Sequence, residues 1–109
     1  MTISYKVLGQ SNPAASTLTD CYTVPSGNSA VVSTITVCNY GANTGIFSIA
    51  VRPAGAAIAN KHYISANITV PIYDSIALTL GVTLASTDVV SVSANIASVS
   101  FNIFGSEIY

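Results

Sequence analysis

Charged residues are scarce in this sequence, and their scarcity excludes several kinds of partner. Only 6% of the 109 residues carry a charge, whereas roughly 25% is usual in a soluble domain. Three cations against four anions give a net charge of −1, so no basic field exists that could neutralise phosphates or anionic lipid headgroups. We therefore expect neither nucleic acid nor a membrane surface as a partner.

Residues that catalyse reactions or bind metals are also few. One histidine and two cysteines without C-x-x-C spacing make no zinc site. The phosphate-binding GxxxxGK[ST] pattern, the GxSxG elbow, HExxH and the EF-hand loop are all missing. Any acid–base scheme would need His62, which between Lys61 and Tyr63 is better interpreted as a surface or interface hydrogen-bonding group. We expect no enzymatic activity, no cofactor and no metal.

Long apolar runs are missing as well. No window of about 20 residues is free of Ser, Thr, Asn, Gly or Pro. The start, MTISYKVLGQSNP, lacks the cationic-then-apolar order of a signal peptide. We therefore expect a product that stays in the cytoplasm where it is made. Cys21 and Cys38 should then remain reduced and pack as small buried hydrophobes.

The strongest signal present is an alternation with period two. Val, Ile, Thr, Tyr and Phe alternate with polar residues and are interrupted at intervals of about 8–12 residues by turn-forming ones, which predicts short antiparallel strands. Val31, Ile35 and Val37 are predicted to share one face of their strand. Residues 53–60 are predicted to form an irregular crossover. About eight strands are expected, around residues 2–7, 18–24, 29–38, 47–52, 62–64 with 67–70, 76–80, 90–94 and 99–103.

One internal repeat indicates how these strands are connected. Thr23-Val24-Pro25-x-x-Asn28-Ser29-Ala30 recurs as Thr69-Val70-Pro71-x-x-Asp74-Ser75-Ile76, each copy directly before an apolar strand. Proline sets φ for a turn and Asn or Asp stabilises it, so two equivalent corners are predicted. This suits an all-β fold in which residues 1–109 form a single antiparallel sandwich of jelly-roll or Greek-key type. Residues 1–18 are expected to form an extended N-terminal strand or arm.

The predicted surface is unusually poor in charge for a free monomer. Strand edges in soluble proteins are commonly protected by charged residues, and this chain has few to use: Lys6, Asp20, Arg52, Lys61 and Glu107. Much of the apolar surface must then be covered by other subunits. We infer an obligate homo-oligomer or a component of a larger shell.

Several segments resemble small virion proteins of tailed bacteriophages, including those of cyanobacteria. The resembling segments are Tyr22–Asn39, Phe47–Ile64, Leu78–Val92 and Phe101–Tyr109. The resemblance covers most of the chain from about Thr19 onward. It implies a non-enzymatic β-sandwich, commonly a homotrimer, that binds the outer surface of a shell or tail and belongs to a virion assembled in the host cytoplasm.

Within that resemblance, the expected function is that of a capsid cement or decoration protein that binds the phage major capsid protein. A neck, baseplate or tail-fibre-associated protein is an alternative, and so is a carbohydrate-binding receptor module that stacks sugars on its tyrosines. The candidate subunit contacts are Arg52, Pro53, His62 and Tyr63. Arg52 is the only guanidinium and can bind a neighbour's carboxylate or backbone in bidentate fashion; otherwise it is an ordinary surface arginine.

Overall fold

The computed structural model describes all of residues 1–109 and contains eight strands with no α-helix. The strands are β1 (Ile3–Ser11), β2 (Thr19–Thr23), β3 (Ser29–Asn39), β4 (Gly45–Arg52), β5 (Tyr63–Val70), β6 (Ser75–Leu84), β7 (Val89–Ala94) and β8 (Val99–Ile108). Two short 3-10 turns, η1 (Pro53–Gly55) and η2 (Asn60–His62), lie between β4 and β5. The chain has no helix with the length and hydropathy needed to span a bilayer.

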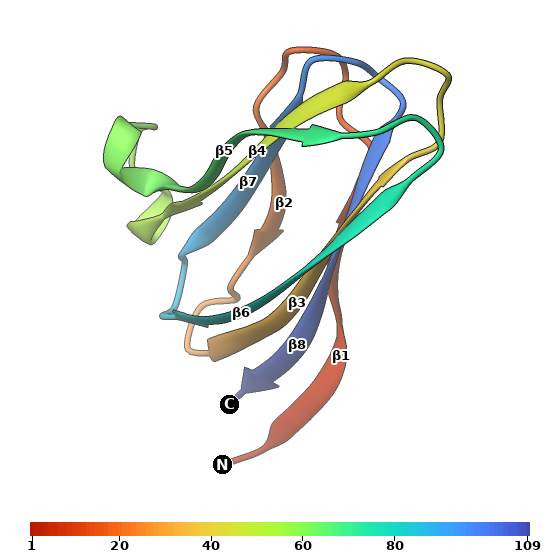
Figure 1. The fold of residues 1–109 in the computed structure, drawn as a ribbon. Coiled ribbons are helices and arrows are strands. Elements are labelled where there is room, and N and C mark those ends of the chain that lie inside the picture. The colour runs from red at the N-terminus through yellow and green to blue at the C-terminus, as the bar shows by residue number, and fades with distance from the viewer.

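The strands form two antiparallel sheets that pack face to face (Figure 1). The order is β1-β8-β3-β6 in the first sheet and β2-β7-β4-β5 in the second. Every strand of the first half pairs with its counterpart from the second half: β1 with β8, β2 with β7, β3 with β6 and β4 with β5. This is the connectivity of a long hairpin rolled into a sandwich, the jelly roll. The predicted all-β antiparallel sandwich is therefore confirmed.

The core lies between the two sheets and is built from the side chains of each strand that point inward. Phe47 of β4 and Phe101 of β8 are both fully buried. Their rings meet edge to face, with centroids 6.0 Å apart and an interplanar angle of 72°, a favourable geometry for aromatic pairs. Aliphatic side chains from both sheets surround this pair, the largest of them Ile35, Ile49 and Ile103.

The two copies of the sequence repeat form the two equivalent corners that the repeat predicted. One copy joins β2 to β3 and the other joins β5 to β6, so that each carries the chain from the second sheet to the first. Val24 and Val70, which precede the prolines, are buried. In the second corner the Asp74 Oδ1 accepts a hydrogen bond of 2.8 Å from the Ser75 N–H. The repeat thus marks two crossings between the sheets.

The prediction that Val31 shares a face with Ile35 and Val37 is wrong. The ladders of β3 shift register around Ser33, which forms a β-bulge. A bulge inserts one residue and moves later side chains to the opposite face. Val32 is consequently fully buried together with Ile35 and Val37, whereas Val31 lies on the outer face of the first sheet.

Two boundaries also differ from the sequence prediction. The extended segments at 62–64 and 67–70 are one strand, β5, whose ladder to β4 shifts register twice. Residues 3–11 of the predicted N-terminal strand or arm form β1, which pairs with β8 along its length. The termini lie together at one end of the sandwich, where Thr2 and Tyr109 exchange backbone hydrogen bonds (Figure 1).

Candidate functional site

Nearly all charged side chains are engaged within the chain. Lys6 pairs with Glu107 at 2.6 Å, and Arg52 pairs with Asp20 at 2.7 Å. The carboxylates of Asp74 and Asp88 accept hydrogen bonds from backbone amides in turns, as the sequence repeat predicted for Asp74. Only Lys61 has no ion pair or side-chain hydrogen bond. The chain therefore offers little free charge to a partner.

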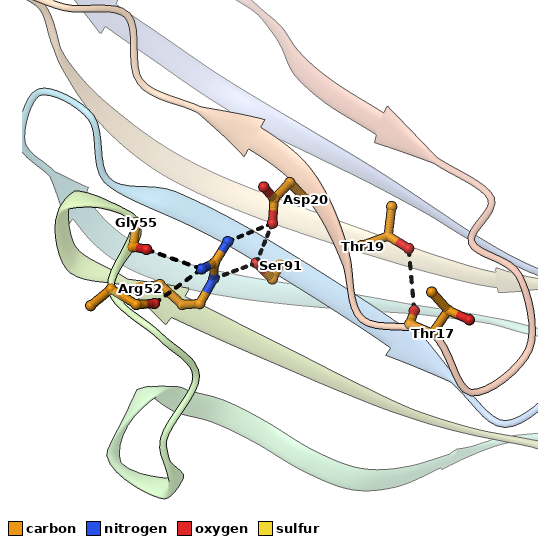
Figure 2. A network of polar contacts seen from close by, with 7 residues as sticks. Thr17, Thr19, Asp20, Arg52, Gly55 and Ser91 are labelled. Atoms are coloured by element: carbon orange, nitrogen blue, oxygen red, sulfur yellow. Dashed lines mark hydrogen bonds and ion pairs between the residues drawn. The ribbon is translucent and has the colours of Figure 1, made fainter.

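Arg52 is the centre of a polar network on the outer face of the second sheet (Figure 2). Its Nη2 contacts the Asp20 Oδ1 at 2.7 Å, and its Nε donates to the Ser91 Oγ at 3.0 Å. Its Nη1 donates to the carbonyl oxygens of Gly55 at 3.2 Å and Ala56 at 3.0 Å. Ser91, which is fully buried, donates in turn to Asp20 at 3.0 Å. The network ties β2, β4, β7 and the η1 turn together.

The four predicted subunit contacts therefore differ in what they offer to another molecule. Four hydrogen bonds within the chain occupy most of the donors of Arg52. His62 is buried, which corrects the expectation of a surface group, and its Nδ1 accepts a hydrogen bond from the Ala59 N–H at 3.1 Å. Pro53 and Tyr63 are exposed. A role of these residues between subunits stays a prediction.

A buried carboxylate joins the two sheets near the chain termini. Glu107 is only 4% exposed; its Oε2 accepts a 2.6 Å hydrogen bond from the Tyr22 hydroxyl, and its Oε1 pairs with the Lys6 ammonium. Lys6 and Tyr22 hold the pKa of the Glu107 carboxyl below its ordinary value of 4.5. Burial and the neighbouring carboxylate raise the pKa of the Tyr22 phenol. Glu107 was expected to protect a strand edge, but it lies on the inner face of β8, which its period-two spacing from Phe101 and Ile103 indicates.

The lowered pKa of Glu107 predicts acid sensitivity. The Glu107 carboxylate contributes stability that is present above the ordinary carboxyl pKa and is lost as the pH falls through the lowered pKa. The free energy of unfolding, measured by urea denaturation at a series of acidic pH values, should therefore fall more steeply for the wild type than for Glu107→Gln. Equal slopes for the two proteins would contradict this role.

An apolar patch covers one end of the outer face of the first sheet. Ile3, Tyr5 and Val7 of β1 are 45%, 83% and 48% exposed. The strand register places Val7 opposite Phe104 and brings Val31 onto the same face. We call Ile3, Tyr5, Val7, Val31 and Phe104 the apolar patch; it borders an open hollow of about 620 Å³. Contiguous exposed apolar surface of this kind marks interaction sites.

A second, more polar hollow of about 430 Å³ lies on the outer face of the second sheet. No charged residue borders it, and its lining combines the Tyr63 ring with amides and hydroxyls. Asn67, with a positive φ of 54°, is held by a 3.1 Å hydrogen bond from its N–H to the Ser48 Oγ. We call this the polar hollow; its lining includes Ser48, Tyr63, Asn67, Ser93 and Asn95.

The remaining candidates form no common site. Cys21 and Cys38 are free and half-buried; Cys21 packs against the core, and burial raises the pKa of its thiol to about 11, so it is a small apolar filler as predicted. The six tyrosines do not gather on one face: Tyr22 is buried, Tyr5 belongs to the apolar patch and Tyr63 borders the polar hollow.

Comparison with known proteins gives structural likenesses only. No protein-family model and no curated protein matches this chain. Among solved structures, a pentameric capsid protein isolated from metagenomic phage sequences is 17% identical, with a TM-score of 0.42, and covers 96% of this chain. A second structure of that description, solved by iodide phasing, is 15% identical, with a TM-score of 0.35 and the same coverage. The chain spans 64% and 65% of their lengths, and at these TM-scores they say nothing about its function.

Proposed function

We propose that this chain is a non-enzymatic structural protein of a bacteriophage virion, and specifically a cement or decoration protein that binds the major capsid protein through the apolar patch. The observation that carries the proposal is the orientation of β1. Its apolar residues Ile3, Tyr5 and Val7 face solvent, while the charge between them, Lys6, is paired with Glu107. A strand arranged in this way needs a partner on its outer face.

Binding of this kind stabilises a shell by mass action. A protein that binds the assembled lattice and not the loose subunit shifts assembly toward the shell. Each Å² of apolar surface that the patch buries contributes about 25 cal/mol, before the costs of association are deducted. The jelly roll agrees with this role, because viral capsid domains use it, but lectins and cupins use it too. The assignment therefore depends on the patch and on the resemblance of the sequence to virion proteins.

The finer expectations follow from the same resemblance. The protein would be assembled into the virion in the host cytoplasm as a homotrimer, with Arg52, Pro53, His62 and Tyr63 at the contacts between subunits. Since Arg52 and His62 are engaged within the chain, Pro53 and Tyr63 would provide most of the contact area. Arg52 and His62 would then act by holding the η1 and η2 turns in shape.

Attachment to the shell should resist salt and depend on the apolar patch. The wild type should stay bound at about 1 M NaCl, where the Debye length is about 3 Å, because the patch carries no free charge. Tyr5→Asp should release the protein, whereas Tyr73→Asp, a control at a 71% exposed tyrosine away from the patch, should not. Co-sedimentation with purified shells measures both. Release of the wild type by salt alone would count against an apolar attachment.

The number of copies of this protein per particle distinguishes a shell protein from a tail protein. A neck, baseplate or tail-fibre protein would be present in roughly 3 to 18 copies per particle, whereas a cement protein would be present in hundreds.

The polar hollow favours a third candidate, a carbohydrate-binding module for neutral sugars, since Tyr63 offers a stacking face and Asn67 and Asn95 offer amides. Glycan binding that Tyr63→Ala abolishes and Tyr73→Ala preserves would support that candidate.

A further inference from the structure

Strand β6 is an unprotected edge of the first sheet. It pairs with β3 on one side and with nothing on the other. Its sequence, SIALTLGVTL, contains no charge and no proline over ten residues, so two of the usual devices against strand addition are missing. Its ladder to β3 shifts register once, between Val32 and Thr34. The other edge of this sheet, β1, contains Lys6. In the second sheet, β2 contains Asp20, and β5 is interrupted by two register shifts.

The side chains of β6 are only half covered by the rest of the molecule. They alternate strictly between exposed and half-buried up to Leu84. The half-buried set packs against the core from the side and consists of Ile76, Leu78, Leu80 and Val82. Figure 1 shows that β5 and β6 leave their shared corner in different directions. The half-buried aliphatic side chains of β6 gain burial when another strand is added to the edge.

The sequence of β6 is complementary to itself about Thr79. In an antiparallel pair with Thr79 opposite its own copy, small residues face small residues and aliphatic residues face aliphatic residues. The opposed pairs are Leu78 with Leu80, Ala77 with Gly81, Ile76 with Val82 and Ser75 with Thr83. No pair brings a large side chain against another large one on the exposed face. Matched cross-strand pairs of this kind stabilise antiparallel sheets.

We propose that β6 pairs with β6 of a second copy of this chain across a two-fold axis at Thr79. The pairing joins two four-stranded sheets into one continuous sheet, satisfies the free backbone groups of the edge and covers its aliphatic side chains. It leaves the apolar patch free, since β1 and β6 are opposite edges of the sheet. It is also separate from the predicted contacts at Arg52, Pro53, His62 and Tyr63, so a trimer built on those contacts would become a hexamer.

A lysine at the two-fold axis tests this contact in the purified protein. Thr79→Lys places two ammonium groups opposite each other and should weaken association at least about 100-fold, halving the mass measured by sedimentation equilibrium. Gln10→Lys is the matched control, an exposed position on the opposite edge strand of the same sheet, and should leave the mass unchanged. Circular dichroism verifies that both variants are folded. A monomeric wild type, or an unchanged mass for folded Thr79→Lys, would overturn the proposal.

Cysteine cross-linking tests the register independently. Thr79→Cys should form a disulfide between copies, because directly opposed Cβ atoms lie about 4.5–5.5 Å apart. Ala77→Cys should not link to itself, because its own copy would lie about 13 Å away along the strand, but it should link when mixed with Gly81→Cys. The wild type controls for Cys21 and Cys38. Failure of Thr79→Cys to link, or linking of Ala77→Cys alone, refutes this register. Neither test involves a shell, so both can fail while attachment to the virion holds.

Discussion

A Gly105→Ala variant should lose about 3 kcal/mol or more of its free energy of unfolding. Gly105 lies in β8 where β3 bulges at Ser33, and a Cβ at this position would overlap the carbonyl of Val31. The obstacle is the backbone of a neighbouring strand, which cannot rotate away as a side chain can. The strands must move apart or the ladder must break. Urea denaturation followed by circular dichroism measures the loss.

Gly81→Ala is the matched control for this prediction. Gly81 also lies in a strand of the first sheet, but a Cβ there meets no other atom within 4 Å. Its backbone is not left-handed, because only Gly27 and Gly55 have positive φ among the glycines. The change should therefore alter stability by no more than about 0.5 kcal/mol. Equal urea midpoints for the Gly105→Ala protein and the wild type would show that the strands accommodate the methyl group without loss of stability.

The strands and their connection were predictable because both depend on local sequence. Alternation over a few residues indicates a strand whatever its partner is, and it located all eight strands. The sequence repeat also predicted part of the connectivity, because two equal turns before two apolar strands imply two equivalent crossings between the sheets. Those crossings are the steps from β2 to β3 and from β5 to β6.

The bulge at Ser33 was not predictable in the same way. Whether Val31 faces inward depends on the register between β3 and β8, which is set by residues far away in the sequence. For Glu107, the alternation of β8 indicated the inner face, but it did not indicate the partners that allow a charge to be buried there. Glu107 is stable in the interior only because Lys6 and Tyr22 reach it from two other strands. A buried charge is identified by its partners, and no local pattern names them.

The candidate contacts around Arg52 illustrate the same limit. A single guanidinium in a chain so poor in charge suggested a role toward a neighbour. The structure instead gives Arg52 its partners from within the chain, Asp20 of β2 and Ser91 of β7. The outward orientation of Ile3, Tyr5 and Val7 was also hidden, since alternation shows that one face is apolar but does not say which face is covered.

Phe101→Ala should lower the free energy of unfolding by about 3–5 kcal/mol, the usual cost of removing a fully buried phenylalanine. Phe101 is 0% exposed and packs edge to face on Phe47 across the two sheets. Truncation leaves a cavity that both sheets border, and the ladders on either side of β8 limit how far it can collapse. Urea denaturation of the purified variant measures the change.

Phe104→Ala, on the same strand, should have the opposite effects: a small loss of stability and a marked loss of binding to the shell. Phe104 lies on the outer face among the apolar patch and is half-exposed, so its removal should cost the folded chain no more than about 1 kcal/mol. It should nevertheless weaken attachment to the shell, because it takes an aromatic ring from the surface that we assign to binding. A Phe104→Ala protein that binds shells as well as the wild type would move the attachment site away from the patch. Since the two phenylalanines are three positions apart on one strand, the comparison separates what holds the sandwich together from what the sandwich presents to its partner.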